Sequence, residues 1–137
     1  MQYLNEAHIT IIRNELLDAI DPYLIMLFGS AAKEQMRRDS DVDIAYLSDV
    51  EINPYEQLLL AEHLANLLKR DVHLLNLNSV STVLQAQVVG KGRIILDKEP
   101  QRRQEYFILV LKKYARLNEE REPVLARIKE RSRVYVQ

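Results

Sequence analysis

The chain has 137 residues, 47% hydrophobic and 28% charged, a composition typical of one globular domain. It contains no cysteine, which excludes a disulfide framework, a thiol nucleophile and a cysteine-ligated zinc site. No apolar run approaches the roughly 20 residues that cross a bilayer. The N-terminal residues lack the basic and apolar regions of a signal peptide, so we expect a soluble cytoplasmic protein without membrane contact.

The net charge of −1 is unevenly distributed. Residues 1–100 contain 9 Lys/Arg and 15 Asp/Glu, a net of −6, whereas residues 101–137 contain 10 Lys/Arg and 5 Asp/Glu, a net of +5. This asymmetry suggests that the two parts have different partners. The basic part fits nucleic acid or an acidic protein face, and a solvated helix surface explains the charge equally well.

The first hundred residues alternate between helical and extended patterns. Asn5 is a suitable cap for a helix that runs to about residue 20. A continuous apolar run over 23–28 predicts a buried strand, and the alternating segment 41–47 predicts a second strand. The other predicted elements are one or two helical turns over 30–35, a helix over 54–68 capped by Asn53, a strand over 71–77, a helix that begins after Ser79 or Ser81 and ends at Gly90, and a strand over 93–96.

The pattern after Pro100 is helical. Residues 101–120 predict a helix with Tyr106 and Tyr114 on one stripe, which fits core or partner packing better than base stacking. Pro123 is expected to interrupt this helix before a second, basic segment. The order of elements predicts an α/β or α+β sheet covered by helices. We expect one domain over 1–100 and a helical, partner-docking extension over 101–137.

Two short motifs carry chemistry. Gly29 lets the backbone approach a ligand, and exposed amides at a helix start, together with the Ser30 hydroxyl, are donors for phosphate. Asp41 and Asp43 lie two residues apart on a strand, so both carboxylates point to one face. Paired carboxylates repel unless a cation lies between them, and Mg²⁺ takes carboxylates plus substrate phosphates. The motifs together predict a metal–triphosphate site for in-line attack on an α-phosphorus.

The same motifs resemble the signature of the DNA polymerase β-type nucleotidyltransferase superfamily. The resemblance is carried by Leu27-Phe28-Gly29-Ser30 and by Asp39-Ser40-Asp41-Val42-Asp43-Ile44. Within the superfamily, the chain is most similar to the minimal nucleotidyltransferase (MNT) proteins, the antitoxin partners of HEPN-domain toxins. The similarity covers about residues 10–98. It implies a small mixed sheet covered by helices, with a C-terminal helical extension.

The resemblance also implies a function. The chain would transfer AMP from Mg-ATP to a hydroxyl group of a cognate HEPN RNase toxin, with tyrosine as the expected acceptor. This modification would neutralise the toxin, and the two proteins would form a hetero-oligomeric complex. Gly29 and Ser30 would bind the nucleotide phosphates, and Asp41 and Asp43 would hold magnesium. Direct nucleic-acid binding is not expected. The alternative is an antitoxin that neutralises its toxin by docking alone, with a vestigial nucleotide site.

Two features depart from the family pattern. The family often has a third carboxylate on the strand that here contains Asp71 and His73, and the natural register places His73 at that position. A neutral His73 can accept the proton of the attacking hydroxyl, Asp71 can substitute from the same strand face, and a packed or surface histidine is equally consistent. The loop after Ser30 lacks the usual arginine and glycine. Lys33 and Arg38 remain as candidate phosphate contacts, although each also fits a solvated loop.

Overall fold

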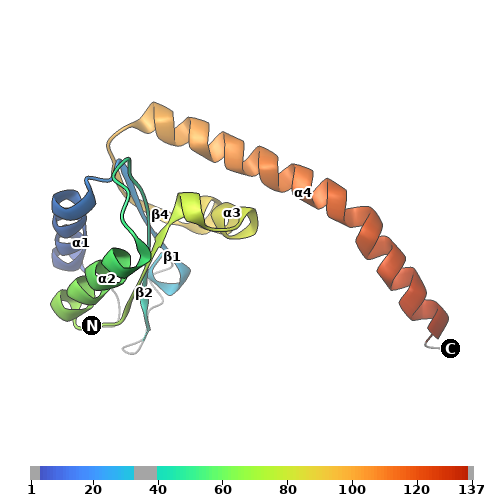
Figure 1. Ribbon diagram of the computed structural model, residues 1–137, viewed down its shortest axis with the longest axis horizontal. Coiled ribbons are helices and arrows are strands. Elements are labelled where there is room, and N and C mark those ends of the chain that lie inside the picture. The colour runs from blue at the N-terminus through green and yellow to red at the C-terminus, as the bar shows by residue number, and fades with distance from the viewer. Residues whose placement is uncertain (1–3, 33–39, 136–137) are drawn as a thin grey trace.

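The computed structural model describes residues 4–32 and 40–135. Helices and strands alternate along most of this length (Figure 1). In chain order the elements are α1 (Glu6–Ile20), β1 (Leu24–Phe28), the short 3-10 turn η1 (Gly29–Ala31), β2 (Val42–Leu47), α2 (Pro54–Leu68), β3 (Val72–Asn76), the 3-10 turn η2 (Leu77–Ser79), α3 (Thr82–Lys91), β4 (Arg93–Asp97) and α4 (Pro100–Tyr135).

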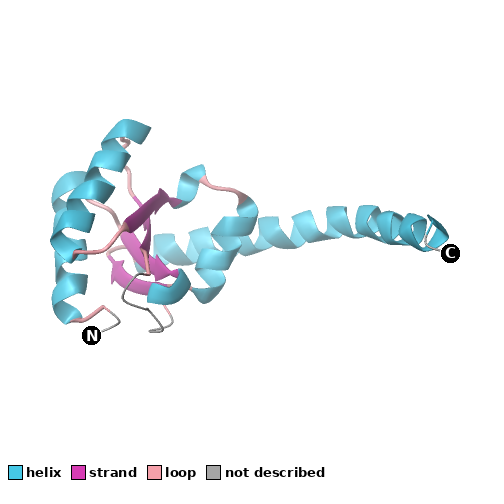
Figure 2. Cartoon of the chain, turned by 90° about the horizontal axis from the view of Figure 1, so that it is seen from below, coloured by secondary structure: helices cyan, strands magenta, loops and turns pink. Residues whose placement is uncertain are grey.

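The strands form one sheet in the order β3-β2-β1-β4. Figure 2 shows this sheet in magenta with helices around it. β1 runs antiparallel to β2 and to β4, whereas β2 and β3 are parallel. The expected small mixed sheet is therefore confirmed. This topology brings the end of β1 and the starts of β2 and β3 to the same edge of the sheet, which is where the two sequence motifs lie.

Helices cover both faces of the sheet (Figure 1). α1 and α2 cover one face, and their apolar residues form a core with alternate strand residues, among them Ile12, Leu16, Ile25, Leu27, Ile44, Tyr46, Leu64 and Leu74. α3 and the beginning of α4 cover the other face, where a second core contains Leu24, Met26, Ala45, Leu47, Leu75 and Val88, with Leu84, Tyr106 and Phe107 packed against it. Because strand side chains alternate between faces, Asp43 lies on the α3 side.

The helix starts follow the capping residues expected from the sequence. Asn5 caps α1 and Asn53 caps α2, each through a reciprocal capping box. In α1 the second half of the box comes from His8, whose Nδ1 accepts from the Asn5 amide at 3.3 Å. Ser81, not Ser79, caps α3. These caps set the residue at which each helix begins, and thus which of its side chains face the strands.

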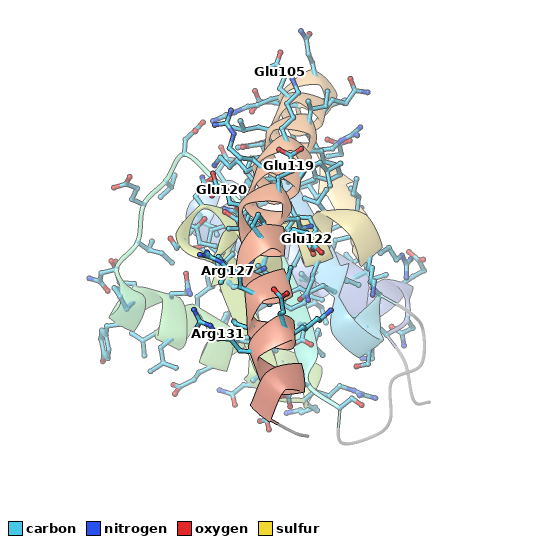
Figure 3. All side chains as sticks on the ribbon, turned by 90° about the vertical axis from the view of Figure 1, so that its right-hand side faces the viewer. Glu105, Glu119, Glu120, Glu122, Arg127 and Arg131 are labelled. Carbon is cyan, nitrogen blue, oxygen red and sulfur yellow. The ribbon has the colours of Figure 1, made fainter. Side chains whose placement is uncertain are left out.

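α4 continues as one helix through Pro123, so the expected interruption there is wrong. Proline removes an amide donor and crowds the preceding turn, but residues 118–132 are exposed, which leaves water free to bond the released carbonyl. The helix therefore curves as it leaves the sheet instead of ending (Figure 1). Figure 3 shows charged side chains spread around this projecting part, among them Glu119, Glu120, Glu122, Arg127 and Arg131. Within the described residues, no helix combines the length and the apolar character needed to cross a membrane.

Candidate functional site

Strand pairing places three residues side by side at this edge of the sheet. Asp43 pairs with Phe28 of β1 on one side and with His73 of β3 on the other. The His73 Nδ1 atom lies 3.4 Å from Asp43 Oδ1. The rings of Phe28 and His73 meet edge-on, with centroids 6.3 Å apart. Asp43 thus lies on the middle strand of the three, between its pairing partners Phe28 and His73.

Gly29 brings the backbone against the same carboxylate. It follows β1 directly and has φ +62°, a left-handed conformation that allows the chain to turn into η1. The Gly29-Ser30 turn lies next to Asp43, because β1 ends beside the start of β2. Ser30 is partly exposed in η1.

Burial makes the Asp43 carboxylate costly to ionise. Its side chain is 24% exposed, and this desolvation raises the pKa of Asp43 above its usual value; the charge of Asp41 acts in the same direction, whereas His73 opposes the shift. A divalent cation would offset this cost, and Mg²⁺ accepts carboxylate oxygens. The described residues contain no group of three or more His, Cys, Asp or Glu side chains placed to hold a metal. The two carboxylates of Asp43 and of the exposed Asp41 are oxygen groups of the kind that Mg²⁺ takes together with substrate phosphates and water.

The other candidate residues have distinct positions. Asp41 is exposed and lies one residue before β2, whose first residue, Val42, donates its amide to the Asp71 carbonyl at 2.8 Å. Asp71 is exposed and lies one residue before β3. The strand pairing puts His73, and not Asp71, in register with Asp43. Lys33 and Arg38 lie outside the described residues.

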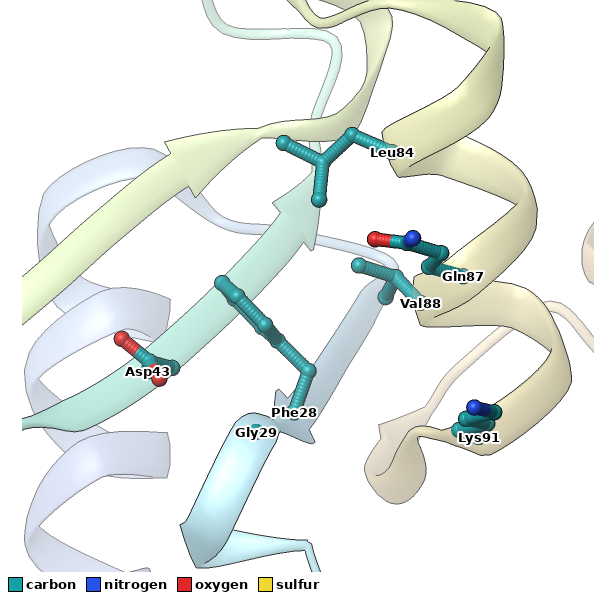
Figure 4. Close-up of a pocket in the computed structure, with 7 residues that line it drawn as sticks. All are labelled: Phe28, Gly29, Asp43, Leu84, Gln87, Val88 and Lys91. Atoms are coloured by element: carbon teal, nitrogen blue, oxygen red, sulfur yellow. The ribbon is translucent and has the colours of Figure 1, made fainter.

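A pocket of about 370 Å³ opens between this edge of the sheet and α3 (Figure 4). It is lined by Phe28, Gly29, Asp43, Leu84, Gln87, Val88 and Lys91. The sequence analysis did not identify the α3 residues as part of the site. Their spacing marks one helix face, but sequence alone does not reveal which strand end that face covers.

A glycine-serine turn after a buried strand lies next to a carboxylate on the neighbouring strand of a small mixed sheet. This is the arrangement that the sequence resemblance to nucleotidyltransferases implies. The comparison with family models agrees. The model described as "Polymerase beta, Nucleotidyltransferase" matches residues 10–101, and the chain belongs to this family.

The chain is also similar to individual proteins whose activity or partner is named. The chain is 34% identical over 125 residues to the protein adenylyltransferase MntA of Shewanella oneidensis, which covers 91% of this chain and 88% of that protein. It is similar to a chain in the crystal structure of a toxin–antitoxin with AMP-PNP, with a TM-score of 0.81, 34% identity and coverage of 92% and 99% of the two chains. A structure of the tri-AMPylated Shewanella oneidensis HEPN toxin in complex with MNT antitoxin contains a chain that matches with a TM-score of 0.78, 30% identity and coverage of 92% and 99%.

Proposed function

We propose that this chain is a protein adenylyltransferase that transfers AMP from Mg-ATP to a hydroxyl of a HEPN-domain toxin, and that it acts in this way as a cytoplasmic antitoxin. The observation that carries the proposal is the meeting of Gly29, Asp43 and His73 at one edge of the sheet. The likeness to an adenylyltransferase and to toxin–antitoxin complexes, one of them with AMP-PNP, supports the same conclusion.

The nucleotide would bind with its phosphates against the Gly29-Ser30 turn. Asp41 and Asp43 would hold Mg²⁺, which supplies positive charge to the triphosphate and to the leaving pyrophosphate. Lys33 and Arg38 stand between the two motifs in the sequence, and we propose them as further phosphate contacts. Most of the rate enhancement in such a site comes from positioning and charge neutralisation.

The transfer itself is a single displacement at phosphorus. The acceptor oxygen forms a bond to the α-phosphorus, the bond from that phosphorus to the oxygen bridging to the β-phosphorus breaks, and pyrophosphate leaves. The hydroxyl proton passes to His73, whose imidazole is 63% exposed and lies beside Asp43. Asp71, two residues earlier on the same strand face, is the alternative proton acceptor.

We propose α4 as the element that docks the toxin. Its outer surface exposes large apolar side chains, namely Ile108, Leu109, Leu111, Val124, Leu125 and Ile128. The net charge of +5 in residues 101–137 suits an acidic partner surface. Residues 1–100 would then perform the transfer, and residues 101–137 would hold the partner. The expected acceptor on that partner is a tyrosine hydroxyl.

One observation favours a second candidate function. The family's usual third carboxylate is replaced by His73 at the position in register with Asp43. If the imidazole cannot serve as the base, the protein would neutralise its toxin by docking alone, with a nucleotide site that no longer transfers.

Intact-mass analysis separates the two functions. The purified chain is incubated with ATP, Mg²⁺ and its HEPN partner, and we expect the partner to gain one or more AMP units. The double variant Asp41→Asn/Asp43→Asn should lose the transfer yet remain folded, because burial already disfavours the charge on Asp43. Asp18→Asn, an exposed position on α1, is the matched control. A stable complex without any mass gain would favour the docking antitoxin, and full transfer by the double variant would overturn the proposed mechanism.

A further inference from the structure

We propose that α3 is the nucleoside-binding wall of this site, with Gln87 recognising the edge of the adenine base and Lys91 binding the triphosphate. The inference rests on the ATP-dependent transfer proposed above and extends it to residues that neither sequence motif contains. It starts from the pocket between α3 and the sheet, whose volume of about 370 Å³ lies within the range of small-molecule sites, roughly 300–1,000 Å³.

The order of residues along the pocket sets the direction of the nucleotide. Figure 4 shows Lys91 at the same end as Gly29 and Leu84 at the opposite end, with Gln87 between them. Since Gly29 belongs to the proposed phosphate turn, the triphosphate lies at the Lys91 end. The nucleoside then extends along α3 toward Leu84.

Gly92 fixes the position of Lys91. A Cβ atom at Gly92 would lie 2.8 Å from Met26 Cε and 3.1 Å from the Leu27 carbonyl oxygen, so the end of α3 is pressed against the end of β1. The Gly92 amide also donates to the Val88 carbonyl at 2.7 Å. The backbone that carries Lys91 is therefore held next to the strand that ends at the phosphate turn.

The charge of Lys91 is available for a ligand. It is the cationic residue among those that line the pocket, across from the Asp43 carboxylate. Among residues 4–32 and 40–135, no carboxylate forms an ion pair with it. An ammonium group in this position offers charge-assisted hydrogen bonds to phosphate oxygens.

The middle of the pocket suits a flat base. Phe28, Leu84 and Val88 provide apolar surface for a ring, and the amide of Gln87 is the neutral polar side chain beside them. The exposed side-chain amide of Gln87 has no hydrogen-bond partner within the part of the chain that the structure describes. A glutamine amide combines one donor and one acceptor at the spacing that matches the amino group and a neighbouring ring nitrogen of adenine.

A neighbouring cavity offers a competing place for the base. It measures about 340 Å³, lies between α3 and α4, and is lined in part by Leu111 and Tyr114. Gln87 and Lys91 border both cavities. We place the base in the first cavity because only that one contains Gly29 and Asp43, and Tyr114 then serves to test the choice.

Isothermal titration calorimetry with the purified chain and Mg²⁺ tests these assignments, using AMP-PNP, AMP and the corresponding uridine analogue of AMP-PNP as probes. We expect Lys91→Met to weaken AMP-PNP about tenfold and AMP less than about twofold, because the lysine meets phosphates that AMP lacks. Gln87→Ala should weaken AMP-PNP and AMP alike, by about fivefold, and reduce the preference over the uridine analogue. Lys112→Met and Gln101→Ala, two exposed positions on α4, are the matched controls.

The outcomes separate this inference from the function on which it rests. Unchanged affinities in both α3 variants, with AMP-PNP still bound and the toxin still modified, would overturn the role of α3 alone. A loss in Tyr114→Leu equal to that in Gln87→Ala would place the base between α3 and α4 and would also overturn it. If the unmodified sequence itself fails to bind AMP-PNP and to modify the toxin, the proposed function fails instead.

Discussion

Gly29 and Asp43 occupy positions that exclude a side chain on the glycine. A Cβ atom built on Gly29 would lie 2.5 Å from Asp43 Oδ2, closer than real Cβ contacts come. The backbone of Gly29 also has φ +62°, which side-chain-bearing residues rarely adopt. The strand pairing of Phe28 with Asp43 forces this approach, because it places the turn after β1 directly over the first residues of β2. A side chain at position 29 would therefore strain the backbone and displace the Asp43 carboxylate.

Replacing Gly29 with alanine tests that requirement. The left-handed conformation alone should cost about 1–2 kcal/mol, and Asp43 must move to admit the methyl group. We expect a lower free energy of unfolding in urea and a transfer rate about 100-fold lower, since displacement of a reacting group by an ångström has effects of this order. Gly90→Ala is the control: its Cβ would meet open space within α3, so it should stabilise the fold by about 0.5–1 kcal/mol. Equal effects of the two variants on transfer would contradict the special role of Gly29.

His73 variants distinguish a proton acceptor from a packed histidine. We expect His73→Ala to lower kcat for AMP transfer about 100-fold, within the range typical of a general base, while Asp71→Asn changes it little. His73→Asp, which supplies the carboxylate usual in the family, should recover part of the lost activity because it restores a proton acceptor at this position. The measurement is kcat for AMP transfer. An unaffected kcat in His73→Ala, or a larger loss in Asp71→Asn, would transfer the role to Asp71.

Truncation before residue 121 separates docking from folding. Residues 121–132 are exposed, so their removal should change the free energy of unfolding by no more than about 0.5 kcal/mol. Binding of AMP-PNP should persist, whereas co-purification of the HEPN partner should be lost. A truncated chain that still binds the partner with full affinity would place the docking surface elsewhere on the molecule. Calorimetry with the partner and thermal melts of the free chain give both quantities.

The contribution of Tyr106, on α4, to the stability of the fold depends on pH. Burial, followed by the charge of Tyr23, raises the pKa of Tyr106 to about 12, and its hydroxyl donates to the Leu77 carbonyl at 3.4 Å. Because the pKa of Tyr106 is higher in the folded chain than in the unfolded chain, its contribution to stability is complete below pH 10.0, the pKa of the unfolded state. This contribution is lost as the pH rises through about 12. Tyr106→Phe should therefore be slightly less stable than the parent at pH 7, but should lose less stability between pH 10 and 12.

Urea titrations at several pH values measure this difference. Tyr55→Phe, at a side chain that is 67% exposed on α2, provides the control and should follow the parent chain at every pH. Parallel stability curves for Tyr106→Phe and the parent above pH 10 would show that the Tyr106 hydroxyl is not protected by packing against the sheet.

Much of the fold was predictable because its signals are local. The capping residues Asn5 and Asn53 and the alternation of apolar residues place each helix and strand of residues 1–100 close to its observed position. α4 was the exception. Proline favours an interruption in any isolated helix, and only the exposed surroundings of Pro123 in the folded chain explain why the helix continues there.

The sequence by itself determined the chemistry of this protein: a glycine-serine turn and two aspartates whose types and spacing suit phosphates and magnesium, because backbone freedom and carboxylate charge are properties of individual residues. Tertiary structure alone decided the partners of those residues. It set His73 rather than Asp71 beside Asp43, and it brought Gln87 and Lys91 of α3 over the same pocket. These relationships depend on strand register and helix packing between segments far apart in the chain, which no local pattern specifies.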